Sequence, residues 1–311
     1  MKILVTGSSS FIGFNLVNHL SKKYEVFWST TKKLKHYRGV RKLRLEKLKK
    51  KNNLIINFNR ISNLEKLFKK HKFDYIFIHH AYTKKANDDK LFNLGRAVDT
   101  NLKGLDKIFS LSKIYGVKKI IHTGTNQEYG NYKNKIRENY KKKPETLYGL
   151  SKTIQTNYLK YLSYYFKIPT ISLKIFNVFG KLDNPNKVTS VVLKNLKNNL
   201  HTDLSSCHQI RDFIYVKDLC KMYEKIMVYN NKSFFEEFNI CSSNKITLKN
   251  FLLKICKNLN KNINLLNFGK MTIRKGENNF NLGSNTKIKT KFKFKFDLNK
   301  CIKDYINSEQ Y

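Results

Sequence analysis

The sequence predicts an α/β fold, a parallel sheet with helices on both faces, joined to a smaller C-terminal lobe. Short apolar runs alternate with segments of helical spacing through the first half of the chain, and this alternation is typical of a parallel sheet. The chain has 311 residues, with 13 Gly and 3 Pro. The length suffices for about two lobes of roughly 150 residues. So few Gly and Pro leave no flexible linker between independent domains.

The expected strands are short apolar runs, each followed by polar residues or glycine. They cover residues 2–6, 24–28, 54–58, 75–79 and 119–123. Apolar residues at helical spacing predict helices over residues 11–20, 62–71, 94–115 and 148–166. The basic stretch 32–53 has no clear pattern. Over residues 287–295 Lys alternates with Ile, Thr and Phe, which predicts a half-buried strand.

The charge balance is strongly basic, with 62 Lys+Arg against 22 Asp+Glu and a net charge of +40. Such a balance is compatible with a nucleic-acid or anionic-membrane partner. Only eight of these cations are Arg, whereas proteins that read base edges rely on Arg. Nucleic-acid binding is therefore kept as a minor alternative. The positive field is expected to attract small polyphosphates.

Cysteine use and hydropathy predict a cytoplasmic protein without a metal site. The five cysteines are widely spaced and form no CxxC or Cys/His cluster. No apolar run is long enough to span a membrane. The N-terminus opens directly on a strand pattern, without the apolar core of a signal peptide.

A glycine- and serine-rich turn stands between the first expected strand and the first expected helix, in TGSSSFIG. A dinucleotide turn needs small residues for a tight bend, for close approach of backbone to the pyrophosphate and for helix–strand packing. The helix N-terminus then faces the phosphates with its partial positive charge. The alternative is a turn without a ligand. We predict a cofactor site made by Gly7, Ser10, Phe11, Ile12 and Gly13.

TGSSSFIG resembles the TGxxGxxG turn of the extended short-chain dehydrogenase/reductase family, which includes sugar-nucleotide epimerases, dehydratases and reductases. The sequence departs from it with Ser10 where the family usually has Gly. The resemblance implies a Rossmann-type doubly wound sheet. It also implies an NAD(P)-binding domain over 1–178 and a mainly substrate-binding lobe over 179–311, with about 212–241 crossing back. A nucleotide sugar is expected between the lobes, at the carboxyl ends of the strands.

The end of the second strand bears on the choice of nicotinamide cofactor. An acidic residue there binds the adenosine ribose of NAD, but Thr30 and Lys32 stand in this region. Hydroxyls followed by lysines suit a 2′-phosphate, so NADP(H) is favoured over NAD(H). The alternative is solvated lysines in a Lys-rich chain. Asn57 stands where the family commonly contacts adenine.

The segment IFIHHAY stands where the family usually reads HLAA. Ala81 is expected beside the cofactor, while the bulky His79 and His80 depart from the family pattern and receive no catalytic role. Asn101 resembles the family's Asn in the helix after the fourth strand, where it holds backbone and a proton-relay water.

A YxxxK motif is formed by Tyr148 and Lys152, and this spacing puts phenol and ammonium on one helical face. A nearby ammonium favours the phenolate and lowers the pKa of Tyr. The motif alone is weak, because a chain so rich in Tyr and Lys contains other copies, such as Tyr115 and Lys119. The family's catalytic pair occupies the setting of KPETLYGLSK, and its catalytic hydroxyl aligns with Thr125. The resemblance also implies that Tyr148 and Lys152 contact the cofactor, with Lys152 holding the nicotinamide ribose.

The residues after Thr125 distinguish between reaction types. The family's 4,6-dehydratases carry an acid and a base there, where this sequence has Asn126 and Gln127. Amides do not exchange protons near neutral pH. Glu128 comes one position late and is expected to point to the other side of the strand. Dehydratase activity is therefore disfavoured, and Asn126 is expected at the substrate.

Three further residues match the family's substrate side. Asn177 in LKIFNVFG resembles an Asn near the substrate diphosphate, and Arg211 and Arg274 match diphosphate-binding arginines. Guanidinium pairs with phosphate bidentately, unlike Lys. The alternative for Arg211 is an ion pair with Asp212 or Asp218.

Residues 178–219 look most like the CDP-paratose and CDP-abequose synthase branch of NADPH-dependent 4-ketoreductases. The resemblance therefore implies reduction of a nucleotide-linked 4-keto-6-deoxy sugar for surface-polysaccharide precursors, with Thr125, Tyr148 and Lys152 as catalytic residues. The main alternative is an NAD-dependent nucleotide-sugar 4-epimerase; a 4,6-dehydratase and a non-catalytic nucleic-acid-binding protein are lesser ones. A homodimer through helices 94–115 and 148–166 is implied, although the apolar faces there could equally be core.

Overall fold

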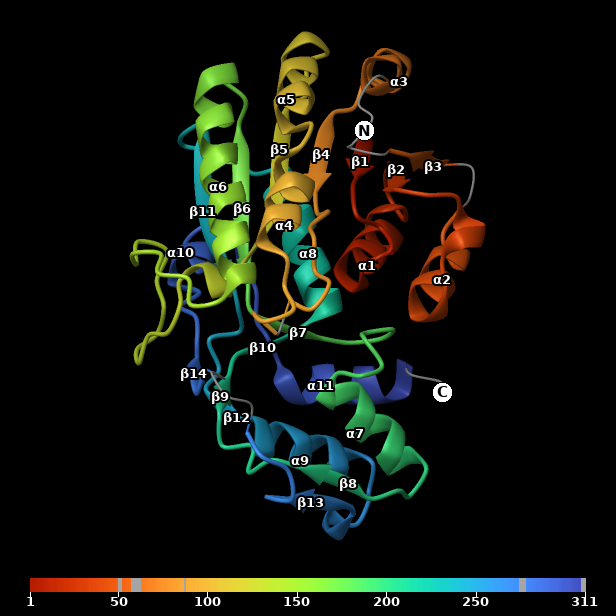
Figure 1. Ribbon diagram of the computed structural model, residues 1–311, viewed down its shortest axis with the longest axis vertical. Coiled ribbons are helices and arrows are strands. Elements are labelled where there is room, and N and C mark those ends of the chain that lie inside the picture. Colours follow the sequence, from red (N-terminus) through yellow and green to blue (C-terminus); the bar gives the residue numbers. More distant parts are fainter. Residues whose placement is uncertain (50–51, 57–62, 87, 274–277, 309–311) are drawn as a thin grey trace. The chain divides into compact units, whose positions relative to one another are not determined.

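The computed structural model describes residues 1–49, 52–56, 63–86, 88–273 and 278–308 (Figure 1). The chain divides into two compact units. The first comprises Met1–Gly130, Glu138–Ile175 and Cys220–Asn239; the second comprises Asn131–Arg137, Phe176–Leu219 and Ile240–Tyr311. The chain thus passes from one unit to the other several times.

The first unit is built on a seven-stranded sheet in the order β11-β6-β5-β4-β1-β2-β3. Its strands are β1 (Lys2–Val5), β2 (Glu25–Thr30), β3 (Asn53–Ile55), β4 (Tyr75–Ile78), β5 (Lys119–Thr125), β6 (Thr170–Ile175) and β11 (Phe235–Ile240). Neighbouring strands from β3 to β6 pair in parallel. The expected α/β fold is therefore confirmed. Burial on both faces explains why β1 and β4 read as apolar runs.

Helices cover both faces of this sheet (Figure 1). They are α1 (Phe11–Leu20), α2 (Gly39–Glu46), α3 (Leu64–His71), α4 (Leu94–Leu102), α5 (Leu105–Ile114), α6 (Leu147–Phe166) and α8 (Val216–Met227). On one face Phe68, Phe109 and Leu159, from α3, α5 and α6, pack with strand residues in one hydrophobic core. Elsewhere Tyr223 of α8 packs against Phe77 of β4 with ring centroids 5.9 Å apart.

Two sequence-based expectations about elements are wrong. The helix expected over 94–115 is two helices, because Gly104 adopts a left-handed backbone conformation with φ 78° between α4 and α5. Among the described residues, the stretch expected as a strand over 287–295 belongs to no strand: α10 (Thr286–Lys289) begins it. Local bonds to Asn285 and Ile288 carbonyls close helical turns there instead. The basic stretch 32–53 contains η1 (Leu34–His36) and α2.

The second unit contains short strands and helices around an aromatic core. Its strands are β7 (Asn177–Phe179), β8 (Thr202–Leu204), β9 (Ile210–Arg211), β10 (Phe213–Tyr215), β12 (Ile246–Thr247), β13 (Leu266–Phe268) and β14 (Phe280–Asn281). Its helices include α7 (Val188–Lys197), α9 (Leu248–Asn258), η5 (Ile263–Leu265), α10 and α11 (Leu298–Ser308). Phe213 stacks on Phe251 at 3.8 Å between centroids, and Phe179 meets Phe251 and Tyr305 edge-on.

No described helix is both long and apolar enough to cross a membrane. The five cysteines are all buried thiols. Within the described ranges, His, Cys, Asp and Glu side chains form no group suited to a metal ion.

Candidate active site

The turn after β1 has the geometry of a tight cradle. Gly7 has φ 69°, and a Cβ there would lie 2.8 Å from the His80 backbone nitrogen. A Cβ on Gly13 would lie 2.5 Å from the Gly7 carbonyl oxygen, so neither position tolerates a side chain. Ser10 caps α1, and its Oγ accepts a hydrogen bond from the Gly13 N–H at 3.0 Å. Backbone donors and the positive end of α1 therefore face the turn, which fits a diphosphate.

The remaining candidates line up along one edge of the sheet. Parallel strands present their carboxyl ends at the same edge, and β5, β4, β1 and β2 are neighbours in that order. Thr30 ends β2, Ala81 follows β4, and Thr125 ends β5. The structure thus brings these three residues to the edge that carries the Gly7 turn, where ligands bind in open α/β sheets.

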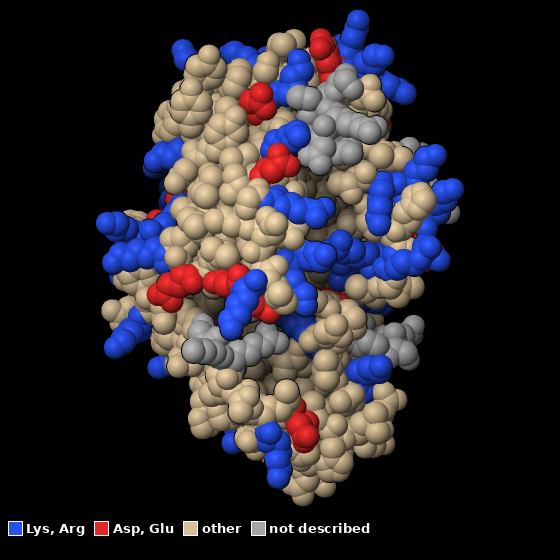
Figure 2. Space-filling model, in the orientation of Figure 1, with Lys and Arg blue, Asp and Glu red and all other residues tan. Residues whose placement is uncertain are grey.

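The surroundings of the β2 end are basic. Lys32 Nζ lies 4.9 Å from the centre of the Tyr37 ring, and Thr30 Oγ1 accepts a hydrogen bond from Asn53. Sequence reasoning missed Arg44, which is 4% exposed on α2 and donates to the Ser9 carbonyl at 3.1 Å. Figure 2 shows Lys and Arg side chains gathered over the α2 side of the unit. Asn57 lies outside the described residues.

Asn101 on α4 forms hydrogen bonds to the segment after β4 and to α6. Its Oδ1 accepts a hydrogen bond from the Tyr82 N–H at 2.8 Å, and its carbonyl accepts one from Gln155 Nε2 at 2.8 Å. The side chain is fully buried, and its Nδ2 has no protein partner. This leaves a buried donor beside α6.

Tyr148 and Lys152 lie in the first two turns of α6. Thr146 caps this helix by accepting a hydrogen bond from the Gly149 N–H at 3.0 Å. A Cβ on Gly149 would lie 2.5 Å from the Gln127 carbonyl oxygen. The missing side chain at Gly149 therefore lets the start of α6 contact the turn that follows Thr125.

Burial controls the protonation of this pair. It raises the pKa of Tyr148 to about 12 and lowers the pKa of Lys152 to about 7. Lys152 Nζ lies 3.0 Å from His122 Nε2 and donates to Gln155 Oε1. The expectation that Lys152 lowers the pKa of Tyr148 is not met in the protein alone, because desolvation of the phenolate and the nearby Glu128 charge raise this pKa.

The residues after Thr125 form a turn, not an extension of the strand. Asn126–Glu128 is the 3₁₀ helix η4, capped by the Thr125 hydroxyl, which accepts from the Gln127 N–H at 3.3 Å. Glu128 Oε1 accepts in return from the Thr125 N–H at 2.9 Å. Strand alternation, on which the expectation for Glu128 was based, does not apply to this turn. The capping box instead directs the fully buried Glu128 side chain back to the Thr125 N–H.

Glu128 belongs to a buried ionic cluster that sequence reasoning missed. Its Oε2 lies 2.6 Å from Lys174 Nζ, and both side chains are fully buried. Lys174 also pairs with Glu237 at 2.9 Å, and Lys142 pairs with Glu237. The two lysines hold the pKa of Glu237 down to about 2 against desolvation. The sequence signal for this cluster was a Lys in the otherwise uncharged strand TISLKI.

In the second unit, Asn177 starts β7 and its buried Nδ2 has no protein partner. Arg211 on β9 donates to the carbonyls of Ile210 and Asn278 at 2.9 and 2.7 Å. The Asp212 carboxylate accepts from the backbone of Ser242, Ser243 and Gly283 and from the Ser242 hydroxyl. Arg274 lies outside the described residues.

A sequence profile of the NAD dependent epimerase/dehydratase family matches residues 3–241, more than three quarters of the chain. The chain belongs to this family. The matched region contains the Gly7 turn, Thr125, Tyr148 and Lys152. The resemblance inferred from these motifs is therefore confirmed at the level of the family.

Characterised relatives within the family catalyse different reactions. The chain is 27% identical to dTDP-D-glucose 4,6-dehydratase of Dictyostelium discoideum over 79% of its length. It is 28% identical to dTDP-4-dehydro-6-deoxyglucose reductase of Escherichia coli over 65%. The matches span 61% and 64% of those two proteins. A shorter match, 29% identical over 34% of this chain and 36% of the relative, is CDP-abequose synthase of Salmonella muenchen.

Solved structures of family enzymes share the fold. UDP-glucose 4-epimerase of Thermotoga maritima, solved with UDP-glucose, superposes with a TM-score of 0.84 at 23% identity, covering 99% of this chain and 98% of that one. UDP-glucuronic acid 4-epimerase of Bacillus cereus, solved with its substrate and NAD, gives 0.83 at 21% identity over 99% and 98%. At this identity the likeness extends to the fold alone.

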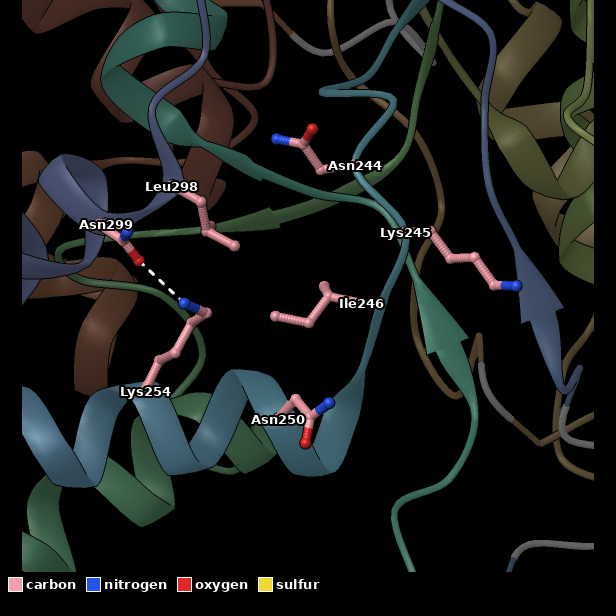
Figure 3. A pocket seen from close by; sticks show the side chains of 7 residues that line it. All are labelled: Asn244, Lys245, Ile246, Asn250, Lys254, Leu298 and Asn299. Carbon is pink, nitrogen blue, oxygen red and sulfur yellow. Dashed lines mark hydrogen bonds between the residues drawn. The ribbon is translucent and has the colours of Figure 1, made fainter.

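The second unit also has an open hollow of about 520 Å³ between the start of α9 and the start of α11 (Figure 3). Lys254 reaches across it and donates to Asn299 Oδ1 at 3.0 Å. All of the residues that line it lie beyond residue 241, where the match to the family profile ends. The other lining residues are Asn244, Lys245, Ile246, Asn250 and Leu298.

Proposed function

We propose that the chain is an NADPH-dependent reductase of a nucleotide-linked 4-keto-6-deoxy sugar. The observation that carries the proposal is the set of side chains around the Thr125 turn. Tyr148 and Lys152 lie on α6, whose start contacts that turn through Gly149. The turn itself presents amides, and its single carboxylate, Glu128, is committed to Lys174.

The cradle at Gly7 and Gly13 fits a dinucleotide, because both positions exclude a side chain and α1 begins there. Gly7, Ser10, Phe11, Ile12 and Gly13 would hold the diphosphate. A bound nicotinamide dinucleotide supplies hydride exchange, which no protein side chain provides. The protein's own residues then have to orient the sugar carbonyl and supply a proton.

In this proposal Tyr148 donates the proton to the carbonyl oxygen. Its pKa of about 12 keeps the phenol protonated throughout the neutral range, which suits the direction of reduction. Lys152 in its charged form stabilises the phenolate left behind. The Thr125 hydroxyl orients the carbonyl oxygen by a hydrogen bond, and Asn126 contacts the sugar.

The same turn argues against a dehydratase. Elimination needs an acid and a base at the sugar, and Asn126 and Gln127 are amides. Glu128 is fully buried and receives the Thr125 N–H, the Thr156 hydroxyl and Lys174. A carboxylate so fully engaged inside the protein has no route to a substrate proton.

NADP(H) is favoured over NAD(H) by the charge at the end of β2. No carboxylate occurs in residues 30–33, which include Lys32, and Arg38, Arg41 and Arg44 lie on the segment that follows. Arg44 contacts the turn directly through the Ser9 carbonyl. A 2′-phosphate gains from such charge, whereas NAD lacks this group.

The substrate proposal rests on the second unit and on the relatives. Asn177 has a buried Nδ2 without a protein partner, and Arg211 and Arg274 supply guanidinium groups for a diphosphate. The Escherichia coli relative acts on a dTDP-4-dehydro-6-deoxy sugar and the Salmonella muenchen relative makes a CDP sugar. The proposed substrate class is therefore a nucleotide-diphosphate keto-sugar.

We also propose a homodimer through the outer face of α6. Leu105, Ile108 and Phe109 do not form this interface, because they lie in the core of the first unit. Tyr161 and Tyr165 are instead 60% and 67% exposed and stack on each other. With Asn157, Lys160 and Tyr164 they line a hollow of about 610 Å³.

The proposal predicts that Tyr148→Phe lowers turnover at least about 100-fold, because the proton donor is lost. The test mixes enzyme, NADPH and dTDP-, CDP-, GDP- or UDP-linked 4-keto sugars, and follows loss of reduced nicotinamide by absorbance. Tyr115→Phe, in the rival YxxxK, is the matched control and should keep full turnover. NADPH binding by Tyr148→Phe should be unchanged.

Other outcomes would assign another function. Interconversion of sugars without net NADPH loss, on a tightly held NAD, identifies a 4-epimerase. Tight nucleic-acid binding with a steep salt dependence, unaffected by Tyr148→Phe and without any turnover, identifies the nucleic-acid alternative.

A further inference from the structure

An unbroken hydrogen-bond chain runs from α8 to the cap of α1. Ser10 Oγ lies 2.7 Å from His79 Nε2, and His79 Nδ1 lies 2.9 Å from Thr123 Oγ1. Thr123 Oγ1 lies 2.6 Å from the Tyr223 hydroxyl. The four side chains come from different segments of the first unit and meet beside the Gly7 turn. No motif assigned a role to His79, Thr123 or Tyr223.

His79 is neutral in this chain, because burial lowers its pKa to about 3. A neutral imidazole has one donor nitrogen and one acceptor nitrogen. His79 therefore either donates to Ser10 and accepts from Thr123, or accepts from Ser10 and donates to Thr123.

Counting protons selects the direction. If Ser10 donates to His79, then His79 donates to Thr123, and Thr123 and Tyr223 share a single hydrogen bond in which only one of them donates. The proton of the other hydroxyl has no acceptor in the chain. Tyr223 is 0% exposed and Thr123 is half-buried, and a buried donor left unsatisfied costs roughly 1–3 kcal/mol. If Tyr223 donates first, Thr123 donates to His79 Nδ1 and His79 Nε2–H donates to Ser10 Oγ. Every buried proton is then used.

That direction determines what Ser10 can do. Its Oγ accepts from His79 and from the Gly13 N–H, which occupies both lone pairs. Its own proton remains, on a half-exposed residue at the N-terminus of α1. The hydroxyl is thereby a donor of fixed orientation at the phosphate-binding turn.

We propose that the Ser10 hydroxyl donates a hydrogen bond to the diphosphate of the dinucleotide, and that His79, Thr123 and Tyr223 are positioning residues that hold its proton outward. This rests on the proposed cofactor binding and adds a contact that a glycine at position 10 lacks. Serine at position 10 then adds a hydrogen bond to the anion, besides being the smallest tolerated replacement for glycine.

The first test needs no cofactor. Nitrogen-15 NMR of histidine-labelled protein should show His79 as the neutral tautomer protonated on Nε2. Tyr223→Phe removes the first donor with almost no change in shape, and should convert His79 wholly or partly to the Nδ1-protonated form. A wild-type His79 protonated on Nδ1 would overturn the proposal.

The second test is calorimetric titration with NADPH. Ser10→Ala and Ser10→Gly should each weaken binding about tenfold or more, because a hydrogen bond to a charged group is lost. Tyr223→Phe should weaken it less, by a few-fold, and Ser21→Ala, at the other end of α1, should leave it unchanged. Circular dichroism melts verify that each variant is folded.

The outcomes separate this inference from the proposed function. If the wild type binds no NADP(H) or NAD(H), the proposed function fails. If the wild type binds NADPH while Ser10→Ala and Tyr223→Phe bind equally well, the inference alone is overturned.

Discussion

At the scale of residues, burial decides the protonation of the catalytic candidates. Tyr148 and Lys152 were predictable from the YxxxK motif and its setting. Their shifted pKa values were not, because they arise first from desolvation and then from the charges of Glu128 and Lys174. The contacts of Lys152 with His122 and Gln155 were not predictable either. His122 is separated from Lys152 by 30 positions, so no local pattern pairs them. Similarly, Ser10 was predictable from the turn, but its contact with His79 depends on strand order.

The pKa of Lys152 predicts a pH dependence. Only the charged ammonium stabilises the Tyr148 phenolate, and a pKa of about 7 leaves about a tenth of it charged at pH 8. The ratio kcat/KM reports groups of the free enzyme and should fall as pH rises through about 7. Steady-state assays from pH 6 to 9 measure it.

Lys152→Arg is the control for this assignment, since guanidinium does not titrate in that range. The residual kcat/KM of Lys152→Arg should no longer fall as pH rises through about 7. A wild-type profile that stays level up to pH 9, or an unchanged limb in Lys152→Arg, would contradict the role given to Lys152.

At the scale of elements, the ion pair between Glu128 and Lys174 joins η4 to β6 behind Thr125. Glu128→Gln leaves a buried ammonium less compensated, so we predict a loss of about 3 kcal/mol in the free energy of unfolding. Glu46→Gln, in the exposed pair with Lys42, should change it by less than about 1 kcal/mol. Urea unfolding at neutral pH measures both.

Comparing Glu128→Gln with Glu46→Gln shows whether burial makes the ion pair important for stability. Equal losses in Glu128→Gln and Glu46→Gln would show that the buried pair has no special importance. Because Glu128 also accepts from the Thr125 N–H, Glu128→Gln should lower kcat more than it weakens NADPH binding.

Periodicity predicted β1 to β5, α1, α3 and α6, since amphipathic helices and buried strands have distinct patterns. It did not predict α2, α8, β6 or β11. It failed where a backbone conformation ends a helix, or where a strand-like pattern has no neighbouring strand to pair with. Gly104 divides the helix over 94–115 by adopting a positive φ, which a periodic apolar pattern does not show. At 287–295 an alternating pattern found no partner strand among the described residues, and local turns formed instead.

At the scale of the whole molecule, the net charge of +40 predicts little about the fold, but it predicts attraction of anionic ligands. Most of the described cations are exposed lysines, but Arg44 is buried and contacts the phosphate-binding turn through the Ser9 carbonyl. The division into units also escaped sequence reasoning in part: residues 131–137 belong to the second unit, and no composition change indicates this.

The exposed tyrosines of α6 predict self-association. Tyr161→Lys with Tyr165→Lys should convert a dimer to a monomer in sedimentation velocity at micromolar concentration, because lysine opposes burial of this face. Ile263→Lys, at an equally exposed apolar position on η5, should have no effect. A wild-type monomer, or dimers that persist in the double variant, would show that this face is not the interface.

The central claim is reduction at C4 of a nucleotide-linked keto-sugar, and isotope transfer tests it most directly. NADPH carrying deuterium at nicotinamide C4 is incubated with enzyme and the 4-keto sugar nucleotide that supports turnover, and the product is analysed by mass spectrometry and proton NMR. The account predicts one deuterium, bound at sugar C4, for each NADPH oxidised. Product without deuterium at C4, formed while NADPH stays reduced, would contradict it.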